Sequence, residues 1–450
     1  MDKIPFKIML ALGAATLLGM NPSTTASDDL LPAQIRTEVD RPLIHEAGKE
    51  QKVVIKIEVT GEEVPQGERM PLNLAIVLDR SGSMSGSKLE QAKQAAEMLV
   101  DQLEPRDVLS LVLYESEVEV VLHAGKVGRR HSEIKRLIRR IQTGGSTALY
   151  GGVERGGKEL GEYFSKERIN RVILLSDGIA NVGPSSNREI AKLGSRLAKK
   201  GMSVTTIGLG EDYNETLMTA LAEASDANYY YVADVETLPD VFRNELGELK
   251  SLVARDFEIR IRCPKGVRPI RFLGRPEEIQ SQNGEFRFGT LAGGQTREIY
   301  LECVVSPEVQ GDLTEIAVVS ADFEDLAKGE TVSTKEKTVV VGYTADEELA
   351  EKSVNRAIEA ESVIYANAVE TEKTIAYADA GDIEASRENI IKQKESLSAV
   401  MAQAPAAQRA LLEEEISELE ATERDLESDS LSKDQRKRLS IGSFLKRNAK

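Results

Sequence analysis

The stretch from Asn73 to Ser87, NLAIVLDRSGSMSGS, constrains the fold of this chain more than any other. It begins with a continuous apolar run, Leu74 to Leu78, which is typical of a strand buried on both faces of a parallel sheet. The run ends at Asp79, and the small hydroxyl residues Ser81 and Ser83 follow. A carboxylate and alternating hydroxyls at the carboxyl end of such a strand lie where open α/β sheets bind ligands. Oxygen ligands of this kind suit a hard divalent cation such as Mg²⁺.

The pattern Asp79-x-Ser81-x-Ser83 resembles the metal-ion-dependent adhesion site of the von Willebrand factor A (vWA) family. In that family a distant Thr and a distant Asp complete the site. Thr147, in the loop TGGSTALYGGV, and Asp177, at the end of the apolar segment VILLSDG, follow in the right order. The other interpretation of Asp79 to Ser87 is a polar loop that caps the next helix.

The resemblance covers about residues 72–249. It implies an α/β fold with a doubly wound, mostly parallel, six-stranded sheet. It also implies a site for Mg²⁺, or for Mn²⁺ or Ca²⁺, with one coordination position open to an Asp or Glu carboxylate of a protein partner. Integrin β-subunits of this family carry extra acidic residues directly after the serines, for an adjacent Ca²⁺ site. The sequence here continues with Met84, Ser85, Gly86, Ser87 and Lys88, so no adjacent site is expected.

Length and charge limit the remaining choices. The 450 residues suffice for about three domains, and the 41% apolar content supports real cores. The formal net charge of −17 disfavours nucleic acid and a bare anionic membrane as partners. We predict five segments: a signal peptide, an N-terminal segment with sandwich strands, the vWA domain, a β-sandwich domain and an α-helical region, at residues 1–26, 27–71, 72–250, 251–343 and 344–450.

The N-terminus has the features of a secretory signal. Lys3 and Lys7 precede an apolar stretch from Ile8 to Met20, and Thr24-Thr25-Ala26 offers a cleavage site. The apolar stretch is short for a spanning helix, although a retained N-terminal anchor is the alternative. We therefore expect a secreted or periplasmic protein that does not insert in a membrane after cleavage.

Strand patterns surround the predicted vWA domain. Residues 255–343 contain short alternating runs separated by turn residues, which is typical of a β-sandwich. The run Gln51 to Thr60, QKVVIKIEVT, also alternates and has no partner inside an α/β domain. We predict that it joins the sandwich, so that the vWA domain is an insertion in it. The two cysteines, Cys263 and Cys303, fall in these strands; a disulfide and two separate buried thiols are the alternatives.

The region after Thr344 is rich in Ala, Glu, Lys and Leu and is predicted to be helical. We expect helices from Asp346 to Ala378, from Asp382 towards Ala402, and from Ala406 to Leu426. The last segment is basic and is predicted to be a solvated tail, with pairing to acidic surface as the alternative.

Three classes of function follow. The favoured one is a metal-dependent protein-binding or adhesion module. The second is a metal-stabilised structural or scaffolding protein whose interactions run through the C-terminal helices. The third is an enzyme, which we do not expect because the only histidines are His45, His123 and His131, and none has a recognisable catalytic setting.

Overall fold

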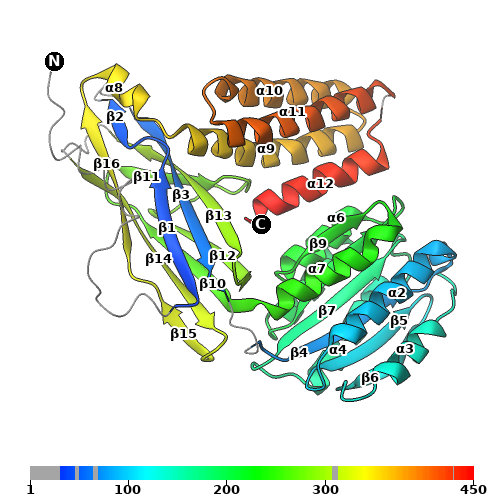
Figure 1. The fold of residues 1–450 in the computed structure, drawn as a ribbon. Coiled ribbons are helices and arrows are strands. Elements are labelled where there is room, and N and C mark those ends of the chain that lie inside the picture. Colours follow the sequence, from blue (N-terminus) through cyan, green and yellow to red (C-terminus); the bar gives the residue numbers. More distant parts are fainter. Residues whose placement is uncertain (1–30, 46–49, 64–68, 307–312, 429, 450) are drawn as a thin grey trace.

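The computed structural model describes residues 31–45, 50–63, 69–306, 313–428 and 430–449. They form an α/β unit, a pair of β-sheets and a C-terminal group of helices (Figure 1). The signal peptide predicted at residues 1–26 lies outside the described residues. Among the helices of the described part, none is long and apolar enough to cross a bilayer.

The α/β unit is built on a sheet with the strand order β6-β5-β4-β7-β8-β9. β6 is antiparallel to its neighbour, and the other neighbouring strands are parallel. The central strands are wholly buried, as their apolar runs require. The strands are β4 (Leu72–Asp79), β5 (Val108–Tyr114), β6 (Val118–Lys126), β7 (Ile169–Ser176), β8 (Ser203–Leu209) and β9 (Tyr229–Val232).

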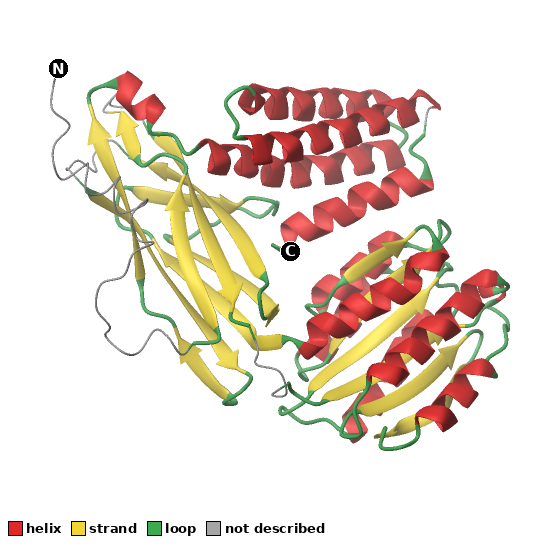
Figure 2. Cartoon of the chain, in the orientation of Figure 1, coloured by secondary structure: helices red, strands yellow, loops and turns green. Residues whose placement is uncertain are grey.

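Helices cover both faces of this sheet (Figure 2). Leu74 and Ile76 of β4 pack with residues of α2, α3 and α7, whereas Ala75 and Val77 pack with residues of α4, α5 and α6. Gly156 of α4 lies so close to β4 that a Cβ there would be 2.6 Å from Val77 Cγ2, so only glycine permits this approach. The helices are α2 (Ser87–Gln102), α3 (His131–Arg139), α4 (Leu149–Glu162), α5 (Asn187–Ala198), α6 (Glu215–Ala224) and α7 (Leu238–Lys250), with 3₁₀ turns η1 (Gly82–Met84) and η2 (Val235–Thr237).

Two further sheets lie against each other beside the α/β unit. The first has the order β1-β3-β13-β11: Ala33–Val39, Gln51–Gly61, Thr296–Val305 and Val267–Phe272. The second has the order β12-β10-β14-β16-β2, with β15 on β14: Asn283–Ala292, Leu252–Arg262, Thr314–Asp325, Lys337–Thr344, Leu43–His45 and Glu330–Ser333. Both sheets contribute to one hydrophobic cluster. β3, which precedes the α/β unit, pairs antiparallel with β13, which follows it.

The two cysteines lie in the cluster between these sheets. Cys303 belongs to β13, and Cys263 directly follows β10 of the other sheet. Both are buried free thiols. The hydrogen bond to Cys263, together with burial, raises the pKa of Cys303. The structure thus has two buried free thiols, the second of the two alternatives, and a hydrogen bond joins them.

The C-terminal region contains five α-helices in its described part and a short 3₁₀ turn, η3 (Leu426–Ser428). The single helix predicted from Asp346 to Ala378 is wrong, because α8 ends at Lys352 and α9 starts at Arg356. The physical reason is Asn355, whose side chain accepts hydrogen bonds from the first amides of α9. The helices are α8 (Glu347–Lys352), α9 (Arg356–Asp379), α10 (Ile383–Met401), α11 (Ala406–Asp425) and α12 (Lys433–Arg447).

The basic C-terminal segment is not a solvated tail. It forms α12, which lies between the helical region and the α/β unit (Figure 1). Phe444 is buried and meets the ring of Tyr229 edge-on, at a centroid distance of 5.7 Å. Lys437 is also buried and donates to Glu215 Oε2 at 3.0 Å. The sequence-based prediction failed because residues that look amphipathic and basic find apolar and acidic partners on another part of the chain.

Candidate metal centre

The predicted site begins where β4 ends. Asp79 is fully buried, and both of its carboxylate oxygens accept hydrogen bonds. Oδ1 accepts from the backbone amide of Ser81 at 2.8 Å, and Oδ2 accepts from the hydroxyl of Ser176 at 2.8 Å. These bonds fix the carboxylate at the start of the loop that leads through η1 into α2.

The two serines of the loop connect Asp79 to Asp177, which follows β7. Ser81 Oγ lies 3.1 Å from Ser83 Oγ, and Ser83 Oγ donates to Asp177 Oδ1 at 2.7 Å. Asp177 is also fully buried. Because β4 and β7 are parallel neighbours, their carboxyl ends bring the two aspartates to the same edge of the sheet.

Thr147 lies in the loop between α3 and α4. Its backbone amide donates to Asn181 Oδ1 at 2.8 Å. The amide of Gly82 donates to the carbonyl of Gly145 at 3.0 Å, which ties the serine loop to the threonine loop. The structure therefore brings Asp79, Ser81, Ser83, Thr147 and Asp177 close together.

Gly178, directly after Asp177, lies beside the hydroxyls of the site. A Cβ at Gly178 would lie 3.2 Å from Thr147 Oγ1, 3.4 Å from Ser83 Oγ and 3.8 Å from Ser81 Oγ. Three hydroxyls from two separate loops thus converge beside the carboxylate of Asp177. This donor set of oxygens alone fits a hard divalent cation. Within the described ranges, no group of three or more His, Cys, Asp or Glu side chains could hold a metal; this site too has only two carboxylates, and its other oxygens are hydroxyls.

Two buried carboxylates close together are electrostatically unfavourable. Burial raises the pKa of Asp79; hydrogen bonds from Ser81 and Ser176 lower it, and the charge of Asp177 raises it. Lys88 relieves part of this cost, since its Nζ lies 2.6 Å from Asp177 Oδ2. Lys88, Ser176 and Asn181 also contact the site residues and were not predicted from the sequence. For Ser176 the available signal was its place directly before Asp177.

The comparisons with known proteins concern the domain and its fold. The family description "von Willebrand factor type A domain" matches residues 73–244. An uncharacterised protein of Synechocystis sp. is 28% identical over 288 residues, which is 62% of this chain and 67% of the relative. The human inter-alpha-trypsin inhibitor heavy chain H3 is 29% identical over 168 residues, but these cover 35% of this chain and only 19% of the heavy chain.

Two solved structures share the fold across most of the chain. A von Willebrand factor type A protein from Catenulispora acidiphila has a TM-score of 0.68 and 18% identity, covering 93% of this chain and 98% of that one. The ArnB paralog VWA2 from Sulfolobus acidocaldarius has a TM-score of 0.59 and 17% identity, with coverages of 93% and 99%. At these identities the likeness concerns the fold alone. Together with the family match, it shows that this chain contains a von Willebrand factor type A domain at residues 73–244.

Proposed function

We propose that the vWA domain binds a protein partner through a divalent cation held by Asp79, Ser81, Ser83, Thr147 and Asp177. The observation that carries this proposal is that the hydroxyls of Ser81, Ser83 and Thr147 converge where Gly178 lacks a side chain. The carboxylate of Asp177 lies directly beside them and accepts a hydrogen bond from Ser83. vWA domains generally mediate protein interactions and typically bind a divalent metal, which agrees with such a donor set.

The ligand count favours a partner that presents Asp or Glu. Two carboxylates and three hydroxyls do not complete an octahedral shell, so a bound Mg²⁺, Mn²⁺ or Ca²⁺ would offer a solvent position to a partner's carboxylate. The net charge of −17 does not prevent an acidic side chain from binding, because a bound cation would be the largest charge near the site.

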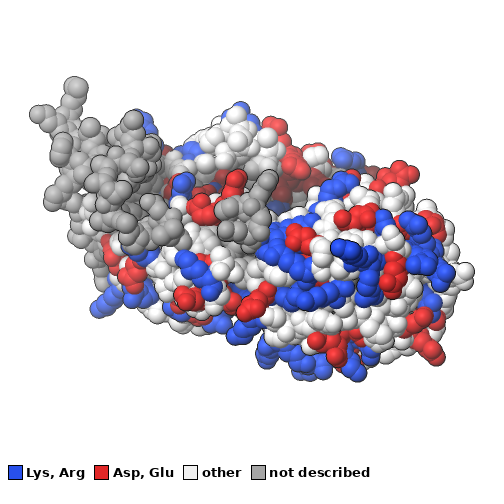
Figure 3. Space-filling view, turned by 60° about the horizontal axis from the view of Figure 1, so that its bottom comes forward, with Lys and Arg blue, Asp and Glu red and all other residues white. Residues whose placement is uncertain are grey.

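The distribution of charge supports approach by an acidic partner. Lys and Arg side chains gather over the α/β unit in the view of Figure 3. Residues 129–140, which include α3 and lead towards the Thr147 loop, hold six basic residues and a single acidic one, Glu133: Arg129, Arg130, Lys135, Arg136, Arg139 and Arg140. Lys135 and Arg139 pair with Asp101 and Glu97 of α2. A local basic surface accelerates the encounter with an acidic protein.

We infer that the rest of the chain serves as a scaffold. The two sheets would form one β-sandwich in which the vWA domain is inserted between β3 and β10, and the helices would brace both. Pairing of β3 with β13 and their shared core support this arrangement. The positive start and apolar segment of residues 1–26 support action outside the cytoplasm.

We also infer that the protein is not an enzyme. His45 and His131 contact the backbone oxygens of Ala345 and Leu103, and His123 lies 3.4 Å from Glu159. None of these imidazoles contacts Asp79, Ser81, Ser83, Thr147 or Asp177, so no histidine is placed to act as a general base there.

The proposal is tested by calorimetric titration of Mn²⁺ or Mg²⁺ into the wild type, Thr147→Ala and Thr143→Ala. Thr143 is the matched control, because it lies exposed in the same loop. Binding should be lost or strongly weakened only in Thr147→Ala. Proteins retained by the immobilised wild type should be released by chelator and not retained by Thr147→Ala. Equal retention by both would mean that the site is structural and that partners bind elsewhere, as on the C-terminal helices.

A further inference from the structure

The carboxylate of Asp177 has two different neighbours. Its Oδ1 accepts the hydroxyl of Ser83 at 2.7 Å, on the side where the hydroxyls converge. Its Oδ2 forms an ion pair with the ammonium of Lys88 at 2.6 Å. Asp177 is fully buried, and the side chain of Lys88 is 26% exposed. A cation among the hydroxyls and the ammonium of Lys88 can therefore engage opposite oxygens of the same carboxylate.

Lys88 is held in this position from both ends of its side chain. Its backbone belongs to the first turn of α2, directly after the serine loop. Its Cε and Nζ are both 3.6 Å from where a Cβ would stand on Gly210, in the loop after β8. The ammonium thus lies between two loops at the carboxyl edge of the sheet.

Other charges nearby are directed elsewhere. Asp212 attracts Lys88 at longer range but pairs with Lys433 of α12 at 2.8 Å. Arg80, which follows Asp79 in sequence, lies 3.2 Å from Glu119 and 3.6 Å from Glu115. Asp177 is therefore the direct partner of Lys88, and Lys88 is the only cationic side chain within ion-pair distance of either site aspartate in the described part of the chain.

The charge balance of the site follows from these contacts. Two carboxylates alone would balance the formal charge of a divalent cation, so an incoming anion would be attracted only through its direct contact with the cation. With the ammonium of Lys88 present, the loaded site keeps one positive charge. That charge opposes cation binding, but it favours a carboxylate at the open position, because the incoming anion then neutralises the site.

We propose that Lys88 sets the ligand preference of the site: it weakens the hold on the divalent cation and strengthens binding of a carboxylate to the loaded site. This inference rests on the proposed function. It adds to that function a residue outside the five predicted ligands. Removing the charge of Lys88 should raise the affinity for the divalent cation and lower the affinity of the loaded site for a carboxylate. A residue that only maintained the shape of the loop would change both affinities in the same direction.

The test uses the full chain and two measurements. Mn²⁺ affinity is measured by electron paramagnetic resonance, and acetate binding to the Mn²⁺-saturated protein is followed by the loss of water-proton relaxation enhancement. In Lys88→Met, Mn²⁺ should bind about three- to tenfold more tightly, and acetate should bind more weakly by a similar factor, as expected for one charge removed from a partly solvated site. Lys88→Gln repeats the measurement with a polar, uncharged head.

Two controls separate charge from structure. Lys88→Arg keeps the charge and should restore both affinities towards wild type. Lys126→Met removes an exposed lysine at the far end of the sheet, where Lys126 pairs with Val108 while Asp79 pairs with Tyr114, and should change neither affinity. Unchanged affinities in Lys88→Met, or two changes of the same sign, would overturn the role of Lys88 and leave the metal site intact. A wild type that binds no Mn²⁺ would instead overturn the proposed function, and this inference with it.

Discussion

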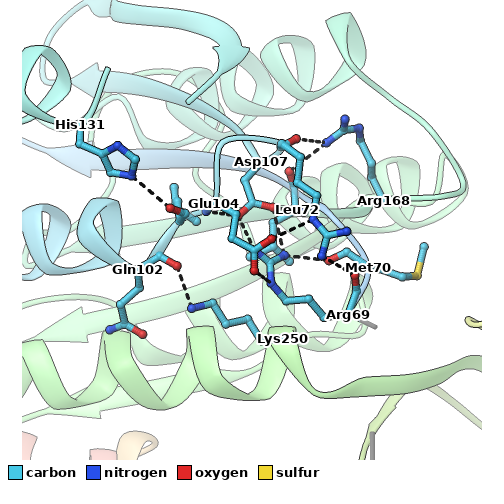
Figure 4. Close-up of polar contacts among 11 residues, drawn as sticks. Arg69, Met70, Leu72, Gln102, Glu104, Asp107, His131, Arg168 and Lys250 are labelled. Atoms are coloured by element: carbon cyan, nitrogen blue, oxygen red, sulfur yellow. Dashed lines mark hydrogen bonds and ion pairs between the residues drawn. The ribbon is translucent and has the colours of Figure 1, made fainter. Parts of the chain in front are cut away.

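Arg69 and Asp107 form a two-pronged ion pair at the base of the vWA domain, where the chain enters β4 (Figure 4). Arg69 Nη1 lies 3.0 Å from Asp107 Oδ1, and Nη2 lies 2.6 Å from Oδ2. The same buried carboxylate accepts the backbone amides of Leu72 and Glu104 at 2.8 and 2.7 Å. Lys250, the last residue of α7, donates nearby to the carbonyl of Gln102. The entry and the exit of the domain are thus fastened to the same corner.

We expect Asp107→Ala to lower the free energy of unfolding by about 3 kcal/mol, because two backbone amides lose their acceptor and the largely buried Arg69 guanidinium loses its bidentate partner, keeping only Glu104 and the carbonyl of Met70. Urea unfolding followed by circular dichroism measures this. Arg243→Ala, which breaks an exposed ion pair with Asp240, is the control and should change stability by less than about 0.5 kcal/mol. Equal effects of the two variants would contradict the prediction.

Metal binding should appear as thermal stabilisation. Mg²⁺ should raise the melting temperature of the wild type by mass action on the folded state, and Asp79→Asn should abolish that rise. Without metal, Asp79→Asn should melt no lower than the wild type, since it removes one of two adjacent buried charges. Differential scanning calorimetry with and without chelator distinguishes these cases. A wild-type melting temperature unchanged by saturating Mg²⁺ would count against a formed site.

Stability should depend on pH through Asp40. Burial raises the pKa of Asp40 to about 6, although hydrogen bonding to the amide of Val54 and the charge of Arg41 lower it. The unfolded carboxyl titrates near 4, so the folded state binds more protons between about pH 4 and 6. This contribution is fully present below pH 4 and is lost as the pH rises through 6, by roughly 2 to 3 kcal/mol.

Asp40→Asn should remove that dependence, because the amide does not titrate but can still accept the hydrogen bond from Val54. The measurement is urea unfolding of both proteins from pH 4 to pH 7.5. The free energy of unfolding of the wild type minus that of Asp40→Asn should fall as the pH rises across this range. Taking this difference removes the contributions of the other titrating groups, which both proteins share. Parallel curves would show that Asp40 titrates normally in the folded protein.

The docking of α12 offers a matched pair of neighbouring residues. Phe444 is buried against Tyr229 of the vWA domain, whereas Leu445 is 38% exposed. Phe444→Ala should therefore cost about 3 kcal/mol, and Leu445→Ala less than about 1 kcal/mol. Limited proteolysis should cleave Phe444→Ala faster at the C-terminus. If the two variants unfold alike, α12 is not held by this contact.

Separate fragments test whether the vWA domain is an insertion. Residues 69–250 contain a complete sheet and both helical layers and should fold cooperatively alone. Residues 251–343 should not, because β13 would lose β3 and expose an unpaired edge. Restoring residues 31–63 through a short Gly/Ser linker in place of the vWA domain should recover a cooperative melt. Cooperative melting of residues 251–343 by themselves would refute the insertion.

The sequence alone was enough where the signal is local. The apolar run Leu74 to Leu78 predicted a doubly buried strand, and the structure buries each of these residues. The spacing of Asp79, Ser81 and Ser83 placed a carboxylate and two hydroxyls at the end of that strand. Side-chain alternation and strand ends are set by neighbours in the chain, so they can be read from it.

Features that depend on contacts between residues far apart in the sequence were visible only in the tertiary structure. Lys88 meets Asp177, which lies 89 residues further on, because parallel strands bring their ends together. The break before α9 falls at Asn355, whose backbone amide donates to the carbonyl of Asp40, far earlier in the chain, at 2.7 Å. The basic last segment is helical and partly buried because the vWA domain and α9 supply surfaces for it. The local sequence pattern indicates which face of a helix or strand is apolar or charged. It does not indicate which other segment covers that face. Burial requires two surfaces in contact, and a single sequence segment provides only one of them.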